Sequence, residues 1–245
     1  MKEISADLKD AFWDIDLRTQ DRLSRVLKCF RKHKIDESAF HGVNGYGHGD
    51  IGREKLDLVV ADLLGAETAL GRLQIFSGTH AISSALFASL RPGQRMLCVS
   101  GPPYDTLEEV VGTRNGGDGS GSLKDWGITY SEIDMLSSQQ TPPQAPPQAH
   151  ANTATDTCLN TLPGEQHFDL PRIAALLADP EQNIALLHVQ RSCGYQWRPS
   201  IPIAEIERLC HFVKDDLGRQ DVTIFVDNCY GELVEGKEPC HVGAD

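Results

Sequence analysis

The sequence predicts an α/β protein of three layers, with a mainly parallel sheet between two layers of helices. Short apolar runs typical of buried strands alternate with amphipathic segments typical of helices along most of the chain. Small or polar turns follow several of these apolar runs directly. Because parallel strands need long crossover connections, this alternation favours a parallel sheet with helices on both faces.

Composition and charge narrow the classes of function. The chain has 245 residues, of which 40% are hydrophobic and 24% charged, as expected for a globular protein with a sizeable core. Its formal net charge is −12, which argues against binding to nucleic acid or to an anionic membrane surface. No apolar run is long enough to span a bilayer, and the charged N-terminus has no secretory signal.

The cysteines point to a reducing compartment. There are 7, at scattered spacings and without a C-x-x-C pair, so neither a disulfide framework nor a zinc site is indicated. His41 and His48 lie on one loop without a third ligand, and we expect no metal. The sequence therefore predicts a cytoplasmic protein.

The N-terminal region, residues 1–40, is predicted to be a helical arm. Apolar residues recur there at helical spacing, and no glycine or proline interrupts residues 1–34. A glycine-rich segment follows, and then a helix that Asp50 caps and Gly65 ends. The glycine-rich segment is either a flexible connection or a ligand loop in which Tyr46 and Arg53 reach an anion.

Residues 72–90 are predicted to contain a strand, a turn and a helix in succession. We expect a short buried strand at 73–76, a turn at Ser77, Gly78 and Thr79, and then an apolar helix. The first amides of a helix lack internal partners, so this turn could hold a phosphate; alternatively it is an ordinary helix cap.

The remaining elements continue the alternation. Further strands are expected at 96–99, 126–133, 184–189 and 222–226, and further helices at 107–111, 169–177 and 203–217. The strand at 126–133 is predicted to lie near an edge of the sheet. Residues 115–121 form a surface turn without a P-loop pattern, and the Pro/Gln-rich residues 137–161 form a low-complexity insertion. Residues 41–245 are thus predicted to be one large domain.

Polar side chains follow three of the expected strands. Tyr104, the pair Arg191 and Ser192, and Asp227 come after strand ends, where open α/β sheets bind ligands. Together with the turn at Ser77, they suit a phosphorylated aromatic cofactor with a basic ring nitrogen, such as pyridoxal 5′-phosphate. A carboxylate beside the ring nitrogen would keep it protonated. Taken singly, Tyr104 could be a half-buried loop aromatic and Asp227 a turn cap.

Several motifs resemble those of the aluminium-resistance protein family, which is methionine gamma-lyase-like or cystathionine beta-lyase-like. They are GYGHGDIGRE, SGTHAISSALFASLRPG, GPPYDTLEEVVG, QRSCGYQWRPS and IFVDNCYGE. The resemblance covers about residues 35–245 apart from the insertion. It implies the large domain of a fold-type-I pyridoxal-phosphate enzyme.

The resemblance assigns cofactor-binding roles residue by residue. It implies that Ser77, Gly78 and Thr79 hold the phosphate, that Tyr104 stacks on the ring, and that Asp227 pairs with the ring nitrogen. Arg191 and Ser192 would approach the phenolic oxygen of the ring. Tyr46 and Arg53 would hold the phosphate of a neighbouring subunit. A homodimer or homotetramer is therefore expected.

The expected function is that of a carbon–sulfur lyase acting on a small amino-acid substrate. The family's Schiff-base lysine lies on the strand after the aspartate, and no lysine here matches it; Lys237 stands too close to Asp227, in a charged turn. We therefore expect an N-terminal portion of a longer enzyme, incomplete at its C-terminus and inactive by itself. The alternative is a non-catalytic scaffold that binds partners.

Overall fold

A four-stranded parallel sheet forms the centre of the computed structural model, which describes residues 8–43, 49–114, 119, 121–137 and 166–245. The strands, in spatial order, are β2 (Thr129–Glu132), β1 (Arg95–Cys98), β5 (Ile184–Gln190) and β6 (Thr223–Asp227). All three neighbouring pairs are parallel. The predicted parallel sheet is confirmed.

Burial distinguishes the central strands from the edge. β5 lies between β1 and β6, and six of its seven residues are buried, which explains its nearly continuous apolar sequence. β2 lies at an edge, as predicted, and its side chains are partly or fully exposed. It begins later than predicted because Gly127, at a φ of 76°, turns the chain just before it.

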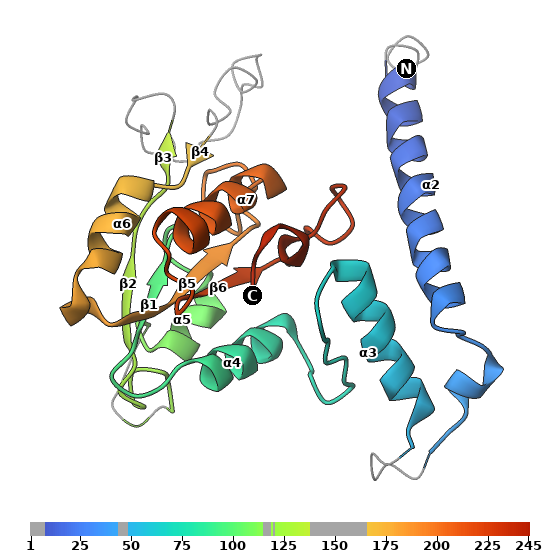
Figure 1. The fold of residues 1–245 in the computed structure, drawn as a ribbon, viewed down its shortest axis with the longest axis horizontal. Coiled ribbons are helices and arrows are strands. Elements are labelled where there is room, and N and C mark those ends of the chain that lie inside the picture. The colour runs from blue at the N-terminus through green and yellow to red at the C-terminus, as the bar shows by residue number, and fades with distance from the viewer. Residues whose placement is uncertain (1–7, 44–48, 115–118, 120, 138–165) are drawn as a thin grey trace, which may run out of the picture.

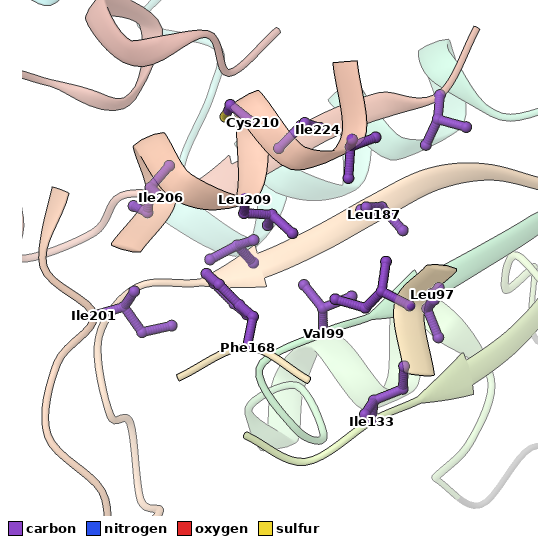
Figure 2. Packing of buried hydrophobic residues seen from close by; sticks show 14 of the residues in the cluster. Leu97, Val99, Ile133, Phe168, Leu187, Ile201, Ile206, Leu209, Cys210 and Ile224 are labelled. Carbon is purple, nitrogen blue, oxygen red and sulfur yellow. The ribbon is translucent and has the colours of Figure 1, made fainter. Parts of the chain in front are cut away.

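Helices cover both faces of the sheet and complete the three layers (Figure 1). On one face lie α4 (Gly78–Ser89) and α5 (Asp105–Val111), and on the other lie α6 (Leu170–Ala178) and α7 (Ile203–His211). Figure 2 shows the core under α7, where Ile206 and Leu209 face Leu187 and Val99 of the sheet region. The predicted helix at 203–217 is thus confirmed for its first part, and it continues as a π-helical turn, η4 (Phe212–Asp216).

The N-terminal region is helical, as predicted. α2 (Lys9–Lys32) leads through a short turn, η1 (Glu37–Phe40), to α3 (Ile51–Leu64), which lies beside it (Figure 1). Lys32 pairs with Asp62 across the two helices at 2.7 Å. Asp50 caps α3 and Gly65 ends it in the left-handed conformation. The division into an arm at 1–40 and a domain at 41–245 stays a prediction.

The predicted strand at 73–76 is wrong. These residues form a turn in which Leu73 is 95% and Phe76 86% exposed. The segment pairs with no strand because the preceding residues are fastened to α3: the amide of Gly71 and the guanidinium of Arg72 both bind Asp57, each at 2.8 Å. The helix that follows is confirmed, but it begins inside the predicted turn: Ser77 is its N-cap, and Gly78 and Thr79 are its first residues.

Two short strands flank the Pro/Gln-rich segment. β3 (Leu136–Ser137) pairs antiparallel with β4 (Gln166–His167). Most of the predicted insertion, and most of the predicted turn at 115–121, lie outside the described residues. Because β4 leads directly into α6, the alternation of strand and helix continues after the insertion.

Candidate functional site

The start of α4 has the features of an anion site. Ser77 is the N-cap, and its Oγ accepts a hydrogen bond from the amide of His80 at 3.1 Å. The amides of Gly78 and Thr79 bond to no described residue, and they lie at the positive end of the helix dipole. A methyl group built at Gly78 would meet nothing within 4 Å, so open space lies over this turn.

Tyr104 joins this turn to the end of β1. It is the N-cap residue of α5, and its hydroxyl lies 3.0 Å from Oγ1 of Thr79. Burial is the largest cause that raises the pKa of Tyr104, and the nearby charge of Asp227 raises it further. The phenol is therefore neutral and forms one wall between the helix start and the carboxylate.

Asp227 is the last residue of β6 and is only 7% exposed. Its Oδ1 accepts a hydrogen bond from the amide of Cys229 at 3.1 Å. Among the described residues no cation pairs with it, and burial raises the pKa of its carboxyl group. A buried carboxylate without a cation is poised to bind a positively charged ligand atom.

Arg191 is held by several contacts within the protein. Its buried guanidinium donates to Oδ1 of Asn228 at 2.6 Å, to the carbonyls of Gly231 and Ile201, and to Glu235. Four of its five N–H groups are therefore directed at the protein itself, around the turn that follows Asp227. The predicted contact of Arg191 with a ring oxygen stays a prediction. Ser192, next along the loop, is half-buried.

Arg53 is not gathered at this site. Arg53 lies in the first turn of α3 and pairs with Asp50 at 2.9 Å. Figure 1 shows α3 beside α2, outside the layered part of the molecule. Tyr46 lies outside the described residues. Lys237 pairs with Glu207 at the surface, 3.1 Å away.

Two polar residues of β5, of which Gln190 lies at this site, were not predicted. Gln190 pairs in register with Asp227, and its side-chain oxygen accepts from the amide of Tyr104 at 2.9 Å. His188 is fully buried, stacks on Phe225, and has its Nδ1 3.4 Å from the Cys98 sulfur. Their alternation with apolar neighbours along β5 was the one available signal, because side chains two apart share a face of the sheet.

His188 predicts an acid-sensitive fold. Burial lowers the pKa of its imidazole from 6.5 to about 4. The unfolded chain therefore takes up this proton first, and the free energy of unfolding should fall by about 3 kcal/mol as the pH drops from about 6.5 to 4. Urea unfolding over this pH range measures the loss.

Replacing His188→Met should flatten that part of the pH profile. The control is His211→Gln: His211 is exposed and its hydrogen bond to Asp215 raises its pKa, so its removal leaves the acid loss in place. An equal pH slope in His188→Met and in the unaltered chain would contradict the assignment.

Fold and site together define a class: a parallel α/β protein with an open helix start, an aromatic residue and a buried carboxylate at the ends of its strands. Comparison with known proteins identifies the family within this class. A sequence model of the methionine gamma-lyase family matches residues 1–154 and 159–245. The chain belongs to this family.

Individual relatives agree with this assignment. The chain is 42% identical over 243 residues to the uncharacterized protein YnbB of Bacillus subtilis, covering 99% of this chain and 50% of that protein. A solved protein from Listeria monocytogenes is 38% identical, with a TM-score of 0.81 over 100% of this chain and 53% of the other. A solved protein from Clostridium novyi, described as a carbon–sulfur lyase involved in aluminum resistance, is 36% identical with a TM-score of 0.80, covering 100% and 50%. The chain spans about half the length of these relatives.

The described residues show neither a metal-binding cluster nor a membrane-spanning helix. Their His, Cys, Asp and Glu side chains form no group of three that could hold a metal ion. None of their helices combines the length and apolar character that a bilayer span requires. The expected oligomer and the expected compartment stay predictions.

Proposed function

We propose that this chain forms the cofactor-binding portion of a pyridoxal-phosphate-dependent carbon–sulfur lyase that acts on a small amino acid. The observation that carries the proposal is the buried Asp227, which pairs with no cation among the described residues and lies beside Tyr104 and the open start of α4. The family and the description of the Clostridium novyi relative support the reaction class.

The residues fit the two ends of this cofactor. The free amides of Gly78 and Thr79 and the hydroxyl of Ser77 suit a phosphate dianion. Asp227 suits a protonated pyridine nitrogen, because the carboxylate and the ring cation each favour the charged form of the other. Tyr104, between them, offers an aromatic face of matching size.

The bound cofactor would supply an electron sink for bond cleavage at the substrate's alpha carbon. The residues of this chain would then hold the ring in place and keep its nitrogen protonated. Asp227 maintains the proton on the ring nitrogen, Tyr104 limits the ring's tilt, and the α4 start anchors the phosphate.

We further propose that Tyr46 and Arg53 act on the cofactor of a second subunit. Arg53 is paired with Asp50 on α3, outside the layered body that carries the other residues (Figure 1). A role from across a subunit interface is compatible with that separation.

A binding titration tests the proposal. The probe is pyridoxine 5′-phosphate, which has the ring and the phosphate but no aldehyde, and so cannot react with surface lysines. We expect saturable binding with a Kd of roughly 0.1 mM, and binding of pyridoxine without phosphate at least about 10-fold weaker. No saturable binding, or equal affinity for both compounds, would refute the proposed function.

Gly78→Ala tests whether the phosphate binds at the start of α4. The new methyl group would occupy the open space over the turn without a clash, so the free protein should become about 0.5 kcal/mol more stable. The same methyl group would stand where the phosphate approaches, and the affinity for pyridoxine 5′-phosphate should fall about 10-fold, or by about 1.4 kcal/mol. Thermal unfolding and the same titration measure the two effects; unchanged affinity would place the phosphate elsewhere.

A further inference from the structure

Gln190 stands at the junction of the three strand ends that form the site. It is the last residue of β5, it is 3% exposed, and it is the direct partner of Asp227 in the parallel pair β5–β6. Residues paired in register on neighbouring strands project to the same face of the sheet. The Gln190 amide therefore lies beside the carboxylate that the cofactor ring is proposed to meet.

Both ends of the Gln190 amide are engaged with the surrounding loops. Its Oε1 accepts from the amide of Tyr104 at 2.9 Å, and its Nε2 donates to the carbonyl of Ser192 at 3.3 Å. One side chain thus ties the loop after β1 to the loop after β5. This bond fixes the main chain of Tyr104, while its hydroxyl lies 3.0 Å from Oγ1 of Thr79 and its ring packs against the core under α4 and α5.

The position of this amide is fixed from several sides. The main-chain amide of Gln190 donates to Ser100, and its carbonyl accepts from Arg198. Gly194 folds back over it so closely, at a φ of 56°, that a methyl group there would lie 2.7 Å from Nε2. Gln196 adds a parallel link from the β5 loop to the carbonyl of Pro102 at 2.8 Å. Gln190 therefore holds the main chain of Tyr104 in a fixed position.

We propose that Gln190 is a positioning residue that sets the ring of Tyr104 against the carboxylate of Asp227. The proposal rests on the proposed function, because it concerns the same ring site. An amide suits this role better than a carboxylate does: it supplies the acceptor that Tyr104 needs and the donor that Ser192 needs, without a charge. The amide thus adds no further negative charge beside Asp227, whose pKa is already raised by burial and by the charge of Glu232.

A purely structural role for Gln190 makes a different prediction. In that case its loss would lower the stability of the fold, and each ligand molecule that still binds would be held as before. A positioning role predicts that the ligand itself is bound more weakly and at an altered orientation. The circular dichroism induced in the bound ring reports that orientation.

The test compares Gln190→Met with Gln182→Met in the full 245-residue chain. Gln182, at the other end of β5 in η3 (Pro180–Gln182), also donates a side-chain hydrogen bond, to Asp179 at 3.0 Å. For Gln190→Met we expect pyridoxine 5′-phosphate to bind about 10-fold more weakly, a smaller induced signal per bound ligand, and at least about 10-fold faster hydrogen exchange at the Tyr104 amide. Gln182→Met should leave all three readouts unchanged.

Gln190→Glu keeps the acceptor for Tyr104 and adds a charge beside Asp227. We expect slow exchange of the Tyr104 amide to be retained, and the acidic limit of ligand binding to move to higher pH, because a like charge raises the pKa of Asp227. This variant keeps the proposal testable if Gln190→Met does not fold.

The outcomes separate the two proposals. If Gln190→Met binds the probe with the affinity and induced signal of the unaltered chain, the positioning role is overturned and the proposed function stands. If Gln190→Glu does not shift the pH limit, the positioning role is overturned too. If the unaltered chain does not bind the probe at all, the proposed function is overturned and this inference falls with it.

Discussion

Replacing Asp227→Asn should weaken the binding of pyridoxine 5′-phosphate at least about 100-fold, which corresponds to about 2.7 kcal/mol. The change keeps the shape of the side chain and its hydrogen bond from Cys229, but it removes the negative charge that faces the ring nitrogen. A hydrogen bond between two charged groups in a buried site has this magnitude. The titration used for the unaltered chain measures the loss.

The same variant should not destabilise the free protein. Burial raises the pKa of Asp227 above its ordinary value, so this group favours the fold at low pH, and that contribution is lost as the pH rises through the raised pKa. At neutral pH the ionised carboxylate therefore disfavours folding. Asparagine removes this penalty, and Tm should stay the same or rise. A lower Tm with unchanged affinity would show that Asp227 serves the fold and not a ligand.

Replacing Arg191→Met should lower the free energy of unfolding by about 3–5 kcal/mol. The side chain of Arg191 is 4% exposed, and its loss would remove the cation that pairs with Glu235. It would also remove one hydrogen-bond donor each from Asn228 and from the carbonyls of Ile201 and Gly231. The turn that follows Asp227 depends on these bonds. Denaturant unfolding of the free protein measures the cost.

Arg114→Met is the matched control. Arg114 pairs with Asp105 at 3.5 Å and is 44% exposed, so its loss should cost no more than about 1 kcal/mol. If Arg191→Met costs as little but abolishes ligand binding, Arg191 contacts the ligand directly, as the family resemblance implies. Our structural interpretation of its guanidinium would then be wrong.

The sheet and the ends of its strands could be predicted because the sequence patterns that indicate them lie within a few neighbouring residues. The apolar run of β5 and the serine before α4 each determine a nearby structure through burial or a cap. Tyr104 and Asp227 could be placed near each other because parallel strands end at the same edge.

What could not be predicted depends on contacts distant in the sequence. Residues 73–76 have the composition of a strand, but Asp57, on α3, holds the preceding residues in a turn. The role of Gln190 follows from its register with β6 and from the fold of the β1 loop, and neither is readable from the strand itself. The contacts of Arg191 within the protein could not be predicted because its partners, Asn228 and Glu235, come later in the chain.

A crystal structure of the chain with pyridoxine 5′-phosphate tests the central claim most directly. We expect the phosphate at the amides of Gly78 and Thr79, the ring against Tyr104, and the ring nitrogen within hydrogen-bond distance of Asp227. A ligand bound elsewhere, or bound at the start of α4 with its ring nitrogen away from Asp227, would contradict the account.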